Sequence, residues 1–97
     1  MLYSDPEIVA FPDIDPQAPV HFLVVPRRHV ENYGSATEED ELLLGHVARV
    51  AVDVARQEGI ADSGFRTVVN NGPDARQSVP HLHMHVLGGR QLGWPPG

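Results

Sequence analysis

The stretch that decides the fold of this 97-residue chain reads His81-Leu82-His83-Met84-His85-Val86-Leu87. Polar and apolar residues alternate along it, and this period of two is typical of a β-strand with one buried face. We therefore predict a final strand over residues 81–87. Its apolar side chains would enter the core, and its three histidines would share the opposite face.

Three further runs rich in β-branched and apolar residues predict strands upstream of this segment. They cover residues 7–11, 20–25 and 65–71, and each is followed by a proline or a glycine. The second run contains one polar residue, His21.

One long helix is expected between the second and third of these runs. Thr37 followed by Asp40 resembles a capping box with aspartate in place of glutamate, and acidic groups suit the positive end of a helix dipole. From Leu43 onward, apolar residues recur at spacings of three and four, which predicts one apolar stripe to about Gln57. Gly59 is expected to end the helix.

The size of the chain and the order of its elements predict the fold class. Ninety-seven residues provide one core, so we expect a single domain over residues 1–97. Two strands, a helix and two more strands predict an α+β domain with a mainly antiparallel sheet of about four to five strands. The helix should cover one face of that sheet.

Composition argues against several function classes. The formal charge is −6, and the cations are seven scattered arginines without any lysine, so no basic stripe is available for a nucleic acid polymer. A mononucleotide can still be held by local backbone N–H groups. The absence of cysteine excludes disulfides and thiolate catalysis. Without a membrane span or a signal-peptide pattern, we expect a cytoplasmic protein and no membrane partner.

Three interpretations of the histidine segment compete, and the least specific is a row of surface residues. A metal site that uses all three rings is opposed by strand geometry. The outer rings would lie roughly 13 Å apart along the strand, whereas ligands converge to about 2 Å from one ion. A His-x-His pair completed by His21 or His29 stays open, and with it a metal-dependent hydrolase.

The third interpretation makes the central imidazole a nucleophile. A neutral ring nitrogen can attack phosphorus and split a hydrolysis into two easier steps, while flanking imidazoles orient it and move protons. Just upstream, residues 72–79 form a polar loop. Its Gln77 and Ser78, together with backbone N–H groups, could bind phosphate oxygens.

The segment from Gln77 to Gln91 resembles the signature of histidine triad (HIT) proteins, and specifically of their Hint branch. Further stretches similar to that branch are Phe11–Ile14, Pro16–Pro26, Leu43–His46, Val68–Asn70 and Trp94–Gly97. The resemblance covers nearly the whole chain, and it implies a HIT-like fold.

The resemblance implies hydrolysis of purine nucleoside 5′-phosphoramidates, such as AMP linked to an amine, or of related adenylates, without a metal or other cofactor. It assigns His83 as the nucleophile that becomes transiently adenylylated. His85 would contact the phosphate and the leaving group. His81 and His21 would form a hydrogen-bonded pair behind the nucleophile. A histidine at position 85 favours hydrolysis, because relatives that transfer nucleotides resemble His-x-His-x-Gln.

The resemblance also implies residues that hold the nucleotide. Asp13, beside Ile14, would accept hydrogen bonds from the ribose hydroxyls. The phosphate or leaving group would be held by Asn70, Gln77 and Ser78. Trp94 belongs to an ending that, in the Hint branch, reaches toward the active site of the partner subunit, which implies a symmetric homodimer.

Two departures from the family pattern affect the expected function. Hint proteins carry a helix and a strand before the segment that resembles residues 2–5, and we expect that helix, which lines the nucleobase pocket, to be missing here. Arg76 stands where relatives often have glycine. A purine-nucleotide-binding module with little catalysis, acting through protein partners, is therefore an alternative function. His29 and His46 are assigned to structure rather than to chemistry.

Overall fold

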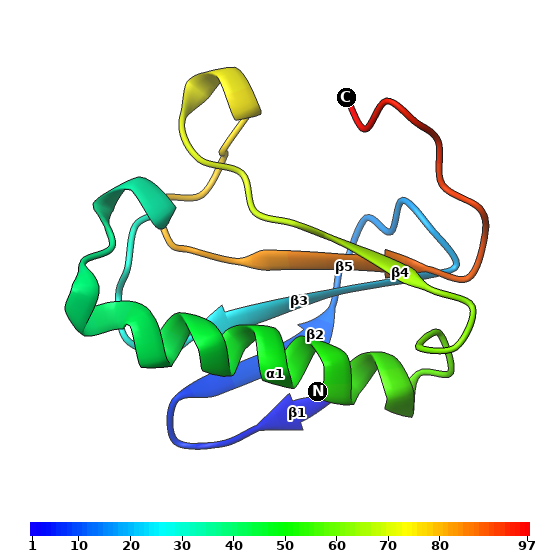
Figure 1. Ribbon diagram of the computed structural model, residues 1–97, viewed down its shortest axis with the longest axis horizontal. Coiled ribbons are helices and arrows are strands. Elements are labelled where there is room, and N and C mark those ends of the chain that lie inside the picture. Colours follow the sequence, from blue (N-terminus) through cyan, green and yellow to red (C-terminus); the bar gives the residue numbers. More distant parts are fainter.

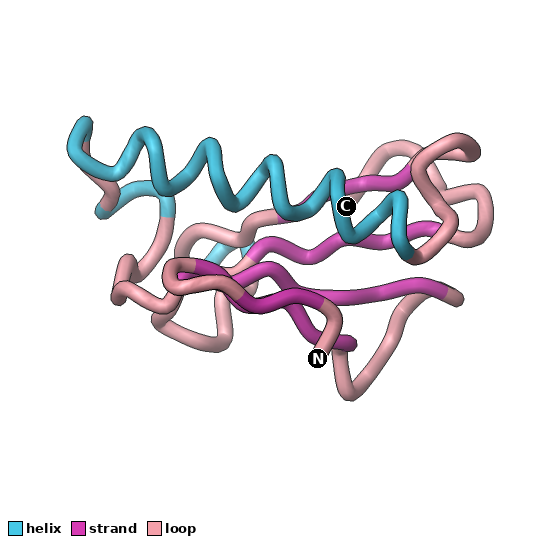
Figure 2. Tube along the Cα trace, turned by 90° about the horizontal axis from the view of Figure 1, so that it is seen from below, coloured by secondary structure: helices cyan, strands magenta, loops and turns pink.

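A five-stranded antiparallel sheet with one long helix along one face makes up the protein, described here by a computed structural model of residues 1–97 (Figures 1 and 2). The strand order across the sheet is β1-β2-β3-β5-β4. The strands are β1 (Tyr3–Ser4), β2 (Ile8–Pro12), β3 (Val20–Pro26), β4 (Phe65–Val68) and β5 (Met84–Gly88). The predicted α+β fold is confirmed.

Helix α1 (Glu41–Gln57) is the predicted long helix, and it begins after a short 3₁₀ turn over Glu38–Asp40. The carboxylate of Asp40 accepts a hydrogen bond of 2.9 Å from the Thr37 backbone N–H, so the expected cap forms on a tighter first turn. Gly59 follows the helix with a φ of +78°, a conformation that glycine adopts without steric cost.

The core lies between α1 and the sheet. The helix contributes the buried side chains of Leu43, Val47, Val50, Ala51, Val54 and Ala55. The sheet contributes Ile8 and Ala10 from β2, Phe22 and Val24 from β3, and Met84 and Val86 from β5. The opposite face of the sheet carries no helix (Figure 2), so its side chains do not pack beneath one.

Strand β5 starts at Met84, three residues later than predicted. Residues before it leave the ladder, because the Leu82 N–H donates to the Val30 carbonyl at 2.7 Å in the connection between β3 and α1. The alternation of burial nevertheless continues, with Leu82 1% exposed and both neighbouring histidines half-buried. The prediction of one hydrophobic face and one histidine face is therefore right, although the strand itself is shorter.

Two other strands differ from the prediction. β4 ends at Val68 rather than at residue 71, because beyond the Val68–His85 pair the chain leaves the sheet to form the loop around a 3₁₀ turn at Pro73–Ala75. β1 was not predicted, since two residues carry no periodic signal.

A hydrogen-bonded turn holds β1 against β2. The Asp5 carboxylate accepts from the backbone N–H groups of Glu7 and Ile8, both at 2.7 Å. The other carboxylate oxygen of Asp5, Oδ2, accepts a hydrogen bond of 2.8 Å from the Tyr3 hydroxyl and lies 2.7 Å from Nε2 of His46 on α1. Burial would raise the pKa of Asp5, but the hydrogen bonds from His46, Tyr3 and the backbone hold it well below its usual range. His46 thus has the structural role expected of it.

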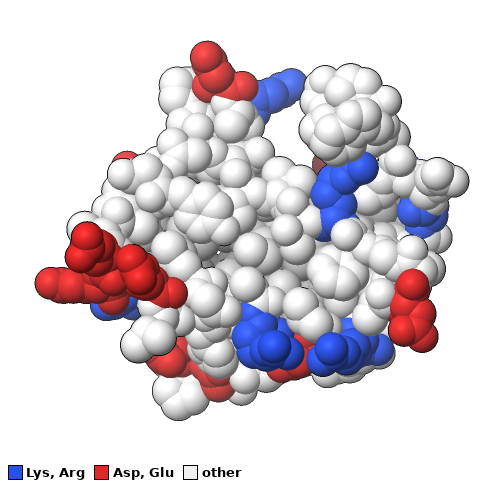
Figure 3. Space-filling view, viewed as in Figure 1, with Lys and Arg blue, Asp and Glu red and all other residues white.

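Charged side chains are dispersed over the surface shown in Figure 3. Basic atoms form separate groups on that face, with acidic groups among them, rather than one continuous basic stripe. The single α-helix is too short and too polar to cross a membrane.

We predict that Leu82→Ala lowers the free energy of unfolding by about 2 to 5 kcal/mol, because it leaves a cavity beneath the histidine segment. Leu42→Ala is the matched control, since Leu42 on α1 is 91% exposed. Urea-induced unfolding followed by circular dichroism measures both variants. Equal losses in the two variants would contradict the assignment of Leu82 to the core.

Candidate active site

The imidazole of His83 lies just before β5 on the face of the sheet opposite the helix, and it is half-buried. Its Nδ1 atom is 2.8 Å from the backbone carbonyl oxygen of His81. A carbonyl oxygen can only accept, so the hydrogen of the neutral ring is on Nδ1. The Nε2 atom therefore carries a free lone pair, which is the form of imidazole that acts as a nucleophile.

His85 and His21 form a second pair on the same face. His85 is in β5, opposite Leu23 of β3, and His21 is two residues from Leu23. The Nε2 atom of His21 lies 2.9 Å from Nδ1 of His85. On its other side, His21 Nδ1 accepts the backbone N–H of Gln17 at 3.0 Å.

These two hydrogen bonds fix the tautomers of both rings. Because the Nδ1 atom of His21 accepts a hydrogen bond, the hydrogen of the neutral ring is on Nε2, which donates to Nδ1 of His85. The neutral His85 ring therefore carries its own hydrogen on Nε2. Its ring centroid is 5.1 Å from that of His83, so the ring that carries this N–H group is a direct neighbour of the His83 ring.

The electrostatic surroundings keep His85 neutral in the free protein. Burial lowers its pKa, and proximity to His83 and His21 lowers it further, whereas the negative charge of Asp13 opposes the shift.

Asp13 follows β2 and is directed at the histidine pair. Its Oδ2 atom lies 3.5 Å from His21 Nε2 and 3.8 Å from His85 Nδ1, while Oδ1 accepts the Asp15 backbone N–H at 2.8 Å. The family resemblance assigned Asp13 to the ribose, whereas in the structure the neighbours of its carboxylate are His21 and His85. Ile14, next to it, is fully exposed.

The expected hydrogen-bonded pair between His81 and His21 does not form. The two residues lie toward opposite ends of β3, because His21 is the second residue of that strand and His81 Nε2 is 2.7 Å from the carbonyl of Pro26, which ends it. The neighbour of His81 is instead His29, with 3.4 Å between their Nδ1 atoms and edge-to-face rings. His29, which the sequence assigned to structure, thus contacts His81, two residues before His83.

The polar loop before the histidines is held together by Gln77. Its side-chain oxygen accepts from Asn32 and from the Gly72 backbone N–H, at 3.1 and 2.9 Å. Its amide nitrogen donates to the carbonyls of Glu31 and Val79, at 2.8 and 3.1 Å. The Gln77 side chain is therefore fully used in joining this loop to the connection between β3 and α1, which leaves none of its polar groups free for a phosphate.

Other predicted residues of this loop are open to a ligand. Ser78 is exposed and lines a polar hollow of about 350 Å³, and Asn70 is half-buried where the loop begins. Arg76 adopts a φ of +61°, the left-handed region, which explains a preference for glycine at this position in relatives.

Trp94 lies in the C-terminal segment and does not join the histidines of its own chain. Its side chain is 80% exposed, and the Arg66 guanidinium carbon is 5.7 Å from the ring centroid. Arg66 also donates to the Gly93 carbonyl at 2.9 Å, which anchors this segment against β4.

One group of side chains meets the spacing that a metal ion requires. The Asp13, His21 and His85 ligand atoms lie within 4.8 Å of one another. In the plane of Asp13 Oδ2, His21 Nε2 and His85 Nδ1, the point equidistant from these three atoms is about 2.0 Å from each, which is a normal zinc–ligand distance. This group is not the His-x-His pair considered from the sequence, because His85 is the only histidine of residues 81–85 that the group contains.

The second nitrogen of His21 argues against a metal at this position. Metal-bound histidines donate a hydrogen bond from the other ring nitrogen. His21 Nδ1 faces the Gln17 N–H, so it must accept one. The Nε2 atom therefore carries hydrogen in the neutral ring and has no lone pair for an ion.

A wide surface hollow elsewhere on the protein does not coincide with these groups. It measures about 620 Å³ and lies beside β4 and the end of β5, where none of the six histidines lines it. We place the active site by the chemistry of the histidines and not by cavity volume.

Comparisons with known proteins find the same family over nearly the whole chain. A model of the HIT domain matches residues 1–92. An uncharacterised HIT-like protein of Synechococcus elongatus is 50% identical over 97 residues, which are 100% of this chain and 84% of that protein. The crystal structure of a HIT family hydrolase from Legionella pneumophila is similar with a TM-score of 0.96 and 41% identity, over 98% of this chain and 85% of that one. A histidine triad protein from Clostridium difficile gives a TM-score of 0.90 and 36% identity, over 94% and 79% of the two chains.

We predict that the pKa of His85 lies below the ordinary histidine value of 6.5, and that Asp13→Asn lowers it further, because the Asp13 charge favours the protonated ring. Since the unfolded chain then binds the proton more tightly than the folded one, this histidine should cost stability as the pH falls below that value. NMR titration of the ring resonances measures both shifts.

Asp15→Asn is the control for this prediction, because the Asp15 charge does not contribute to the shift of His85. A pKa of His85 above the ordinary value, or a rise of that pKa in Asp13→Asn, would contradict the arrangement described.

Proposed function

Because this chain belongs to the HIT domain family, we propose that it hydrolyses purine nucleoside 5′-phosphoramidates or related adenylates through a nucleotide attached to His83. The single observation that carries the proposal is the 2.8 Å hydrogen bond from His83 Nδ1 to the His81 carbonyl. It leaves Nε2 unprotonated and fixed in direction, as attack on phosphorus requires.

In the first step, His83 Nε2 attacks phosphorus and the bond from phosphorus to the leaving nitrogen breaks. The negative phosphate raises the pKa of His85 in the complex, so this ring takes a second proton from solvent on Nδ1. The His21 Nε2–H and the His85 Nδ1–H then both face Asp13 Oδ2, which lies 3.5 and 3.8 Å from the two nitrogens, instead of each other. His85 Nε2 gives its proton to the leaving nitrogen, which departs as a neutral amine. The products of this step are adenylylated His83 and neutral His85.

In the second step, water attacks the phosphorus of adenylylated His83. His85 Nε2 takes one proton of that water, and the bond between phosphorus and His83 breaks. AMP leaves, and both histidines return to their starting protonation states. No step needs a metal or another cofactor.

The neighbouring groups suit a mononucleotide. We propose that Asp13 receives the ribose hydroxyls beside the exposed Ile14, and that Ser78 and Asn70 contact the phosphate or the leaving group. Gln77 has a supporting role, since its amide already makes four hydrogen bonds, two within the loop and two to the connection between β3 and α1. The assignment to the Hint branch rests on the same residues.

We predict that His83→Ala reduces turnover of an adenosine phosphoramidate by at least about 10⁴-fold, the scale of loss when a covalent nucleophile is removed. The wild-type protein should yield AMP and a trapped adenylyl group on His83, detected by mass spectrometry. His46→Gln is the control, since it removes a histidine of α1 outside the site.

Undiminished turnover in His83→Ala, or an adenylyl group on another residue, would exclude the mechanism. Wild-type protein that binds AMP and hydrolyses no phosphoramidate would favour the alternative of a nucleotide-binding module.

We also propose a symmetric homodimer in which Trp94 of one subunit completes the site of the other. The proposal is supported by the exposure of Trp94 and by β4, which is an edge strand beside the C-terminal segment.

We predict that His83→Ala and Trp94→Ala, each impaired alone, regain activity when unfolded together and refolded as a mixture. A mixed dimer contains one site with both an intact His83 and an intact Trp94. Analytical ultracentrifugation establishes the dimer, and the rate of AMP release measures the recovery. A monomer in solution, or a mixture no more active than its components, would refute the shared site.

A further inference from the structure

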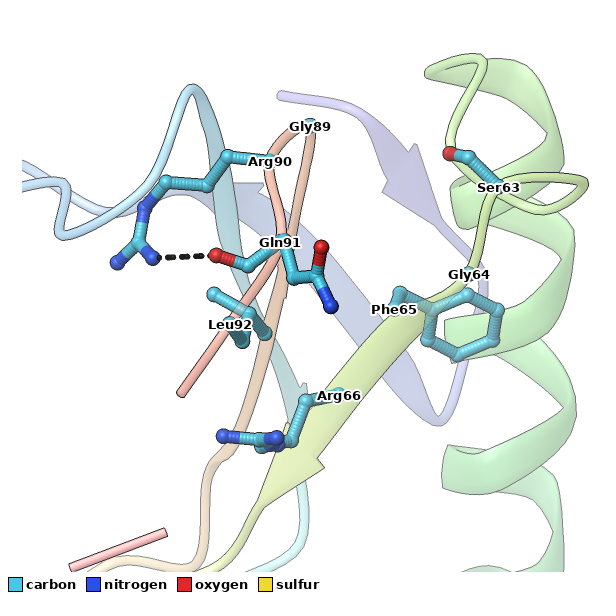
Figure 4. Close-up of a pocket in the computed structure, with 8 residues that line it drawn as sticks. All are labelled: Ser63, Gly64, Phe65, Arg66, Gly89, Arg90, Gln91 and Leu92. Atoms are coloured by element: carbon cyan, nitrogen blue, oxygen red, sulfur yellow. Dashed lines mark hydrogen bonds between the residues drawn. The ribbon is translucent and has the colours of Figure 1, made fainter. Parts of the chain in front are cut away.

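Arg90 lies outside the candidate active site but contacts the chain that leads into it. It follows β5 and borders the large hollow, together with Ser63, Phe65 and Arg66. Figure 4 shows its side chain extended away from Phe65 and Ser63, with the guanidinium group over the loop between β2 and β3. The guanidinium donates to the Gln17 carbonyl at 3.0 Å and to the Gln91 carbonyl at 3.1 Å.

Gln17 is held from several sides in that loop. Arg90 binds its carbonyl, and its own side chain donates to the Asp15 carbonyl at 3.0 Å. Its backbone N–H lies 3.0 Å from His21 Nδ1. This N–H belongs to the peptide between Pro16 and Gln17, and the carbonyl that Arg90 binds belongs to the next peptide, so Arg90 holds the backbone on the far side of the Gln17 Cα atom. Prolines at positions 16 and 19 have no N–H group, so they cannot supply this hydrogen bond.

The direction of this N–H decides where the hydrogens of two imidazoles lie. A neutral histidine without a fixed partner can place its hydrogen on either nitrogen. With the Gln17 N–H opposite Nδ1, a hydrogen on that nitrogen would set two donors against each other. His21 must then carry its hydrogen on Nε2, which donates to His85 Nδ1 at 2.9 Å.

We propose that Arg90 is a positioning residue for the leaving-group histidine. By holding the backbone of Gln17 it fixes the tautomer of His21, and His21 in turn keeps the hydrogen of His85 on Nε2, the proton donor of the proposed mechanism. The effect on catalysis rests on the proposed function. The effect on the tautomers does not, because it follows from the hydrogen bonds alone.

The test of the tautomers uses long-range ¹H–¹⁵N NMR correlation spectra of the free protein, which distinguish protonated from unprotonated ring nitrogens. Wild-type protein should show His21 and His85 each with hydrogen on Nε2. Arg90→Met should give mixed tautomers for both rings, and Arg90→Lys should restore them in part. Arg49→Met, which removes a surface arginine from α1, is the control. Unchanged tautomers in folded Arg90→Met would overturn the proposal.

A second pair of variants tests the Gln17 backbone without changing Arg90. Gln17→Ala keeps the backbone N–H and should leave the tautomers as in the wild type. Gln17→Pro removes that N–H and should mix them, with folding checked by circular dichroism. Mixed tautomers in Gln17→Ala would show that the side chain, and not the peptide N–H, sets them, and would likewise overturn the proposal.

The activity test compares two leaving groups. Arg90→Met should lower kcat about 10- to 100-fold for an AMP–amine substrate, whose leaving nitrogen needs the proton of His85. For the p-nitrophenyl ester of AMP, whose leaving group needs no proton, kcat should stay near the wild-type value. Equal losses for both substrates would overturn the positioning role. Wild-type protein inactive on the phosphoramidate would instead refute the proposed function and leave the NMR test valid.

Discussion

The alternation of side chains through residues 82–86 is the constraint on which the rest of the structure depends. This segment runs into β5, which lies between β3 and β4, and its apolar side chains fill the core beneath α1. A shift of register by one residue would bury imidazoles and expose Leu82, Met84 and Val86. The hydrophobic effect therefore fixes the direction of the histidines as firmly as any contact that they make themselves.

Backbone groups then determine what each imidazole can do. The carbonyl of His81 holds a hydrogen on His83 Nδ1, and the carbonyl of Pro26 holds one on His81 Nε2. The N–H of Gln17 has the opposite effect on His21. Chemically identical rings thus receive different roles, because each one faces a donor or an acceptor that the fold has placed there.

The same reasoning separates nucleophilic from metal chemistry. Asp13, His21 and His85 have the spacing of a zinc site, yet the hydrogen bond on the far side of His21 requires a hydrogen where an ion would bind. Distances alone would admit an ion, whereas the polarity of a single backbone contact argues against one at His21.

The sequence by itself determined the layers and the central residue of the site. Periods of two and of three to four residues in local segments predicted the sheet, helix α1 and the histidine face, since these patterns depend on local geometry and burial. The signature around His83 indicated the family. Only the tertiary structure decided which histidines meet. Antiparallel pairing of β3 with β5 brings His21 to His85. The segments that continue these strands bring His29 to His81 and Arg90 to Gln17. These neighbours are 64, 52 and 73 residues apart in the chain, and no local pattern encodes the loop paths and strand register that join them.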